Sequence, residues 1–194
     1  MQTANFSAIA RKMRDLVSRR RVRIVHPIPR DRWIVKVPQR AGDAATRRKS
    51  PKHLGAIDVF AELVSFPELI GHENFELDVV LVDEETVWSY DGRKGWRRRG
   101  WVTVERRLLA VRETLRLRHR ADYVSMIAAA LPDEFRTTDL AGAIARPRWM
   151  AQKVAYCLRK GGCIEQVGAQ GNAIVYRKFN PSNLQFPALQ LPAN

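Results

Sequence analysis

A short tract near the middle of the chain combines two side-chain types that contact nucleic acids. Residues 91–101 hold five cations and two tryptophans. Guanidinium groups pair with phosphates, and tryptophan rings stack on unpaired bases. The alternative is a cation–π arrangement in which Trp96 and Trp101 pack across strands beneath the arginine side chains. The candidate nucleic-acid-binding residues of this tract are Arg93, Lys94, Trp96, Arg97, Arg98 and Arg99.

The acidic block at residues 51–90 offers a different chemistry. Metal-dependent nucleases of the PD-(D/E)XK class place an acidic residue on one strand and an acid-x-lysine on the next, so that carboxylates hold magnesium while lysine orients water. The order of elements over residues 57–104 loosely resembles that arrangement, with Glu62, Asp78 and Glu105 as candidate catalytic carboxylates. Arg107 stands where lysine is expected, and arginine cannot be deprotonated. A nuclease, or a degenerate nuclease-like fold used for binding, is the alternative function.

Histidine and cysteine show no metal-ligand spacing. The four histidines, at positions 26, 53, 72 and 119, are not paired in sequence with a cysteine or an acid in any known catalytic or metal-binding arrangement. Cys157 and Cys163 are too few for a disulfide framework and lack the companion ligands of a zinc site. We interpret them as buried residues in a reducing compartment. No metal site and no cofactor are predicted, apart from magnesium under the nuclease alternative.

The charge of the chain is unusual and unevenly distributed. The net charge of +14 favours a polyanionic partner. Residues 1–50 carry 14 Lys/Arg against 3 Asp/Glu, residues 51–90 carry 1 against 9, residues 91–120 carry 11 against 3, and residues 121–194 carry 8 against 5. The basic excess therefore lies mostly in the N-terminal part, unless the acidic block neutralises it within the fold. No apolar run approaches the roughly 20 residues of a membrane helix, which predicts a cytoplasmic protein with no membrane partner.

The first 120 residues predict a basic, mixed α/β domain. An amphipathic helix is expected over residues 5–20, followed by two strands, 22–25 and 33–37, joined by a turn-rich spacer with two prolines. Residues 40–52 are expected to form a loop, and residues 57–69 a helix ended or kinked by Pro67. The sequence RRKSPK at 47–52 resembles a stretch of uncharacterised bacterial proteins, which implies no function.

Further strands are expected along the second half of that domain. The apolar pattern predicts a strand from residue 75, a turn at 83–85 and a hairpin partner at 86–90. A strand at 101–104 is followed by a short helix or another strand at 108–117.

From residue 121 the pattern predicts three helices and a hairpin. A first helix ends before Pro132, a short strand lies near Phe135, and a second helix, capped by Thr137 or Thr138, stops at residues 145–146. The third helix spans residues 147–160, and its apolar stripe is Met150, Val154, Cys157 and Leu158. Strands at 163–167 and 173–176 follow, joined by a glycine-containing turn.

This order of elements resembles the winged helix-turn-helix superfamily over residues 121–179. The resemblance implies that the third helix enters a major groove, while the hairpin, the wing, approaches the backbone or minor groove. The candidate DNA-binding residues are Arg146, Arg148, Trp149, Gln152, Lys153, Tyr156 and Arg159 on or beside the helix, with Gln170, Asn172, Arg177 and Lys178 on the wing. The alternative is a winged helix that serves only protein contacts.

The sequence thus predicts an α+β protein with three parts: a basic domain at 1–120, a winged-helix domain at 121–179 and a proline-containing tail at 180–194. The expected function is non-enzymatic binding of double-stranded DNA, as a regulator. A targeted nuclease and an RNA-associated factor are the alternatives. The sequence neither predicts nor excludes a homodimer.

Overall fold

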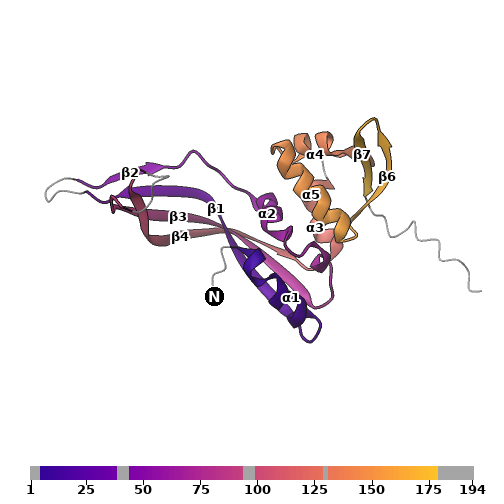
Figure 1. Cartoon of the computed structure of the whole chain (residues 1–194), viewed down its shortest axis with the longest axis horizontal. Helices are drawn as coiled ribbons and strands as arrows, with labels where there is room; N and C mark the ends of the chain where they lie inside the picture. Colours follow the sequence, from indigo (N-terminus) through magenta and orange to yellow (C-terminus); the bar gives the residue numbers. More distant parts are fainter. Residues whose placement is uncertain (1–4, 39–43, 94–98, 129–130, 179–194) are drawn as a thin grey trace, which may run out of the picture.

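The computed structural model describes residues 5–38, 44–93, 99–128 and 131–178. The fold is α+β, as the sequence predicts, with two separate sheets. A four-stranded sheet in the order β2-β1-β3-β4 crosses the molecule, and a three-stranded sheet in the order β5-β7-β6 belongs to the C-terminal part. Figure 1 shows the large sheet extending well beyond the helices at one end.

The N-terminal helix packs on the large sheet. It begins as the 3-10 turn η1 (Phe6–Ile9) and continues as α1 (Ala10–Val17), close to the predicted span. Asn5 caps it, because its side chain accepts a hydrogen bond from the Ser7 N–H at 2.9 Å. Phe6 is fully buried, stacked on Phe66 with ring centroids 5.1 Å apart.

The prediction of two separate strands at residues 22–25 and 33–37, joined by a turn-rich spacer, is wrong. β1 (Val22–Lys36) is one strand of 15 residues that runs through Pro27 and Pro29. At these prolines β1 pairs only with β3 (Phe75–Tyr90), in parallel, because β2 (Thr46–Lys49) reaches only as far as Trp33. One edge of β1 is free there, and a free edge tolerates residues that lack an N–H. β2 itself lies where a loop was expected.

The predicted turn at residues 83–85 is also wrong. β3 continues through Asp83, Glu84 and Glu85 and includes the segment assigned to a hairpin partner. Its antiparallel partner is β4 (Trp101–Leu117), a single strand of 17 residues that covers both the strand expected at 101–104 and the segment expected as a short helix or another strand at 108–117. The three carboxylates are accommodated inside the sheet because each one pairs with an arginine of another strand of the same sheet. These partners are Arg112 on β4, Arg32 on β1 and Arg47 on β2.

Three short helical segments connect the two hairpins of this sheet. They are η2 (Ala56–Val59), α2 (Phe60–Leu63) and η3 (Pro67–Leu69), so the predicted helix over 57–69 is broken. Pro67 starts η3 rather than ending a helix, since proline fits the first position of a helical turn. Phe60, Leu63 and Phe66 are fully buried.

The C-terminal part contains the three predicted helices and the hairpin. The elements are α3 (Arg120–Ala128), β5 (Glu134–Arg136), α4 (Thr137–Ala143), α5 (Arg148–Lys160), β6 (Ile164–Gln170) and β7 (Ala173–Lys178). The predicted threonine cap of α4 is wrong: the Asp139 carboxylate accepts the Arg136 N–H at 2.8 Å. Ala145, in the turn before α5, has a left-handed φ of 48°. The predicted tail at 180–194 lies outside the described residues.

One hydrophobic cluster joins both parts of the chain. It runs from Phe6 to Tyr176 and includes buried residues of α1, β1, α2, β3 and α5. α5 contacts α4 on one side and both α2 and η3 on another. In the described part of the chain, no helix is long and apolar enough to cross a membrane.

Candidate nucleic-acid interface

The helix α5 has a buried side and an outward side. The predicted apolar stripe of Met150, Val154, Cys157 and Leu158 is at most 1% exposed. Ala151 and Ala155 are equally buried, because α2 and η3 cover a second side of the helix. The sequence prediction missed this second contact, for which the small residues at i and i+4 are the only signal. The solvent-exposed face of α5 is therefore narrow.

Four predicted residues form a stripe along that outward side. Arg148, Gln152, Tyr156 and Arg159 follow one another at helical spacing and line a shallow groove of about 220 Å³. Asn172 and Ile174 of the β6–β7 hairpin line the same groove. We call these six residues the α5 groove. The structure therefore brings together the helix and one predicted hairpin residue.

The two arginines of the α5 groove differ from Arg177, a predicted cation of the hairpin. Within the described ranges, neither Arg148 nor Arg159 pairs with a carboxylate. Arg177, in contrast, lies 2.5 Å from Glu134 and 3.7 Å from Glu165, and these carboxylates raise the pKa of its guanidinium.

Two other predicted hairpin residues also bind groups of the same chain. Lys178 Nζ donates to the Leu131 carbonyl at 2.8 Å, and Gln170 accepts from Arg136 at 3.1 Å. Together with Arg177 they link the hairpin β6–β7 to the strand β5 and the segment before it. Each of these three side chains thus makes at least one polar contact within the chain.

Arg146 and Trp149, at the start of α5, do not line the α5 groove. The Arg146 guanidinium makes three hydrogen bonds to Asp58, 2.7–3.3 Å long, and this pairing raises its pKa. It is therefore a link between α5 and η2. The Trp149 side chain is 57% exposed, and Lys153 Nζ lies 5.4 Å from its ring centroid.

The large sheet projects from the helices as an extended arm (Figure 1). We define the arm as β2, residues 31–36 of β1, residues 83–90 of β3 and residues 101–112 of β4. Arg93 and Arg99 follow and precede the strands β3 and β4 at its far end. The predicted residues Lys94, Trp96, Arg97 and Arg98 lie outside the described residues.

Aromatic rings and cations alternate on the arm. Trp101 packs edge-on against Tyr90, with centroids 5.7 Å apart, and Lys36 Nζ lies 4.6 Å from its ring centroid. Trp101 therefore takes part in a cation–π contact, as the alternative interpretation of residues 91–101 predicts. The cation, however, is Lys36 of β1. Trp33, which the sequence analysis did not select, lies between Arg47 and Lys49, 5.1 and 5.3 Å from them.

The arm also carries cations that have no acidic neighbour. Arg48 and Arg106 lie on the same face, since Arg48 is in register with Ile34, Ile34 with Thr86, and Thr86 with Arg106. In the described part of the chain neither one pairs with a carboxylate, whereas Glu85 is contacted by both Arg47 and Arg107. The exposed charge of the arm is therefore positive.

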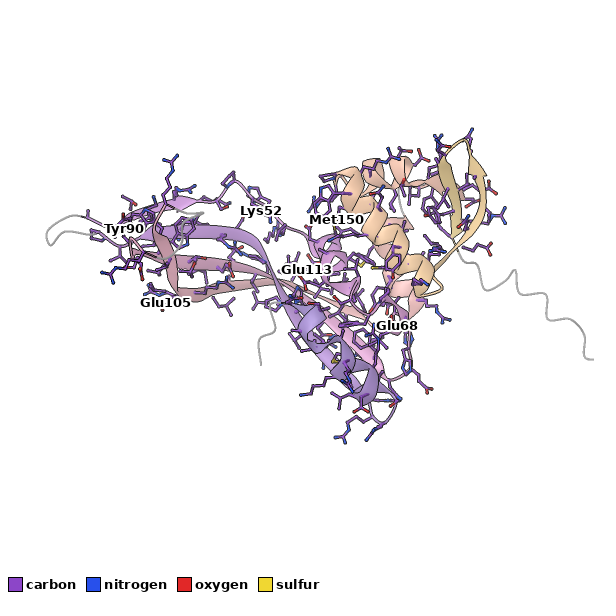
Figure 2. The ribbon with its side chains drawn as sticks, in the orientation of Figure 1. Lys52, Glu68, Tyr90, Glu105, Glu113 and Met150 are labelled. Carbon is purple, nitrogen blue, oxygen red and sulfur yellow. The ribbon has the colours of Figure 1, made fainter. Side chains whose placement is uncertain are left out.

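The three carboxylates of the nuclease alternative do not meet. Glu62 Oε2 accepts the Phe6 N–H at 2.9 Å, and Asp78 binds Arg23, whose Nε is 2.9 Å away. Glu105 pairs with Val87 in the sheet, nine residues along β3 from Asp78, which is about 30 Å of strand. Figure 2 places Glu105 far out on the arm, where Arg107 lowers the pKa of its carboxylate. The described residues contain no cluster of three His, Cys, Asp or Glu that would hold a metal ion.

Comparisons with known proteins give a family without an assigned activity. An uncharacterised protein of Treponema pallidum (strain Nichols) is 26% identical over 190 residues, which cover 96% of this chain and 73% of the relative. That alignment extends into the C-terminal part. No solved structure matches. Residues 1–118 match the family described as "Domain of unknown function (DUF8091)", which covers more than half of the chain. The protein therefore belongs to the DUF8091 family.

Proposed function

We propose that this protein binds double-stranded DNA, and that residues 120–178 are a winged helix whose α5 enters the major groove. The observation that carries the proposal is the α5 groove. Its two arginines, Arg148 and Arg159, face outward beside an amide and a phenol, and no described carboxylate neutralises them. A helix face that only contacts water would not need two guanidinium groups, an amide and a phenol aligned along it.

The side chains of the α5 groove match the chemistry of a base-pair edge. Arginine donates two parallel hydrogen bonds to guanine O6 and N7, and glutamine pairs with adenine N6 and N7. Asn172 and Ile174, on the hairpin beside the helix, suit contacts to the sugar-phosphate backbone and the groove wall. The order α3-β5-α4-α5-β6-β7, with β7 between β5 and β6, supports the winged-helix assignment.

The arm supplies the long-range attraction in this proposal. The arm as defined contains eight Lys/Arg against five Asp/Glu. Positive potential steers a protein toward DNA and adds phosphate contacts that carry no sequence information. We assign base contacts to α5 and phosphate contacts chiefly to the arm. The proposed role of the protein is regulation of a process that acts on DNA.

The salt dependence of binding tests the proposal. A labelled duplex is titrated with the full-length protein at several salt concentrations, and the affinity is compared with that of Arg148→Ala and Arg159→Ala. Removal of one phosphate contact flattens the slope of log affinity against log salt by about 0.9, and removal of one base contact costs about 1–3 kcal/mol on one sequence. Arg11→Ala removes the same charge from the exposed face of α1 and is the matched control.

Two outcomes would overturn the proposal. The first is that both α5 variants bind duplex DNA with the affinity and slope of the Arg11→Ala control. The second is that a single-stranded RNA of equal length binds more tightly than the duplex, which would favour an RNA-associated factor. Arg48→Ala with Arg106→Ala tests the arm separately, with a flatter slope expected on every sequence.

A further inference from the structure

A cleft of about 450 Å³ lies where the arm meets the start of α5. Its walls are β1 near its prolines, residues 52–54, the helices η2 and α2, and the first turn of α5. Lys52 and Met150, labelled in Figure 2, both line it, one from each part of the chain. The volume lies within the range of small-molecule sites, about 300–1,000 Å³. The cleft is separate from the α5 groove.

Most charged groups around this cleft neutralise one another. Asp58 pairs with Arg146, and the His53 Nδ1 atom lies 2.7 Å from the Asp31 carboxylate. Glu62 and Lys52 are different, because within the described residues neither forms an ion pair. Glu62 accepts one backbone N–H, from Phe6, and a carboxylate has further lone pairs to offer. The cleft thus has one open acidic group and one open basic group.

The third open polar group is His26. Burial lowers the pKa of its imidazole, and the nearby Glu62 carboxylate opposes that shift without reversing it. A neutral imidazole has one donor and one acceptor nitrogen. Beside the Glu62 carboxylate it adds one further hydrogen-bond acceptor and one donor to the cleft wall.

Flat apolar surfaces complete the cleft. The Trp149 ring and the rings of Pro27 and Pro29 line it together with Leu54 and Met150. Planar ligands stack on such surfaces, and tryptophan is a strong stacking side chain for bases. A fitting ligand is therefore planar, has N–H donors on one edge and carries a negative charge elsewhere.

We propose that this cleft binds a purine nucleotide, stacked on Trp149, with its N–H edge toward Glu62 and its phosphate toward Lys52. Guanine is preferred, because its Watson–Crick edge offers two adjacent N–H donors to a single carboxylate. The nucleotide is either free in solution or an unpaired base of a nucleic-acid strand. Occupancy of this cleft does not require duplex binding by α5.

Calorimetric titration of the full-length protein with GMP, AMP, UMP, guanosine and inorganic phosphate tests the nucleotide site. We expect GMP to bind about tenfold more tightly than AMP, and guanosine and inorganic phosphate each to bind more weakly than GMP. Trp149→Ala and Glu62→Gln should each weaken GMP binding about tenfold. Glu73→Gln, at an exposed position in the turn before β3, is the control and should change nothing.

A second titration identifies the source of the base. A short single strand with one guanine is compared with the same strand abasic at that position. The proposed site is supported if GMP or the strand binds with a preference for guanine and if both cleft variants abolish that preference. No preference in either ligand, or a preference that survives both variants, overturns it.

Both cleft variants are expected to fold. Trp149 is exposed, and the amide oxygen introduced by Glu62→Gln can still accept the Phe6 N–H. The melting temperature of each variant verifies folding. Abolished GMP binding with unchanged duplex affinity would separate this site from the proposed DNA-binding function.

Discussion

The Arg146 guanidinium lies 2.7 Å from the Asp58 carboxylate, measured from Nη2 to Oδ2, although the two residues are 88 positions apart in the sequence. Arg146 stands two residues before α5, and Asp58 also accepts the Gly55 N–H at 2.8 Å. The pair fixes the start of α5 to η2. The side chains are 26% and 15% exposed, so solvent screens the interaction only in part.

Asp58→Asn should lower the free energy of unfolding by about 2 kcal/mol, because the Arg146 guanidinium would remain desolvated without its counter-charge. Urea denaturation followed by circular dichroism measures the change. Asp15→Asn removes the partner of Arg19 in an exposed ion pair and should cost less than about 0.5 kcal/mol. Equal destabilisation of the two variants would contradict a structural role for the Asp58–Arg146 pair.

Gly161→Ala should destabilise the protein by about 1–3 kcal/mol, the usual cost of overpacking. A Cβ at this position would lie 2.6 Å from Ile70 Cβ and 2.7 Å from Ile70 Cγ2, at the contact between α5 and the segment after η3. The φ of Gly161 is −79°, which alanine adopts freely, so the cost is steric. Thermal unfolding of the variant is the measurement. Gly168→Ala meets no atom within 4 Å and serves as the control; a comparable destabilisation there would refute the steric explanation.

Stability should fall as the pH decreases below about 6.5, in part because of His26. Burial lowers the pKa of this residue in the folded protein, so below its unfolded pKa the unfolded chain binds the proton more readily than the native one. Unfolding free energies at pH 8 to 5 should therefore decrease more steeply in the wild type than in His26→Gln. His119→Gln, at an exposed position, should keep the wild-type dependence. Parallel curves for the wild type and His26→Gln would exclude this contribution.

Both cysteines should resist thiol reagents in the folded protein. Cys157 and Cys163 are fully buried, and burial raises their pKa to about 12 and about 11. At pH 8 each thiol is protonated as well as inaccessible, and the thiolate is the reactive form. Ellman's reagent should therefore react slowly with the native protein and release two equivalents in guanidinium chloride. Fast modification of either cysteine before unfolding would show that its surroundings open.

The C-terminal elements were predictable because each is determined by nearby residues. The helix α5 follows Pro147, has a regular apolar stripe and ends before two glycines, all of which are readable from sequence. The outward stripe of Arg148, Gln152, Tyr156 and Arg159 follows from the same periodicity. The partners of Arg146 and Arg177 were not predictable, since Asp58 and Glu134 reach them only through the tertiary fold.

The large sheet was mispredicted for a physical reason of the same kind. Pro27, Pro29 and the carboxylates of residues 83–85 are local signals for turns. Here they lie inside long strands, because a free strand edge accepts the prolines and arginines on the neighbouring strands neutralise the carboxylates. The cleft beside Trp149 was equally hidden, since its walls come from four separate segments.

The contact of α5 with α2 and η3 has a consequence for other members of the family. The family match ends at residue 118, yet Phe60 and Ile70 are covered in this protein by a helix that begins at residue 148. Removing that helix would expose apolar surface to water and promote self-association. Any homologue that has only the N-terminal portion must therefore recruit a substitute cover, from another segment or a separate subunit. A homologue that keeps the N-terminal portion must therefore also have a segment or subunit that takes the place of α5.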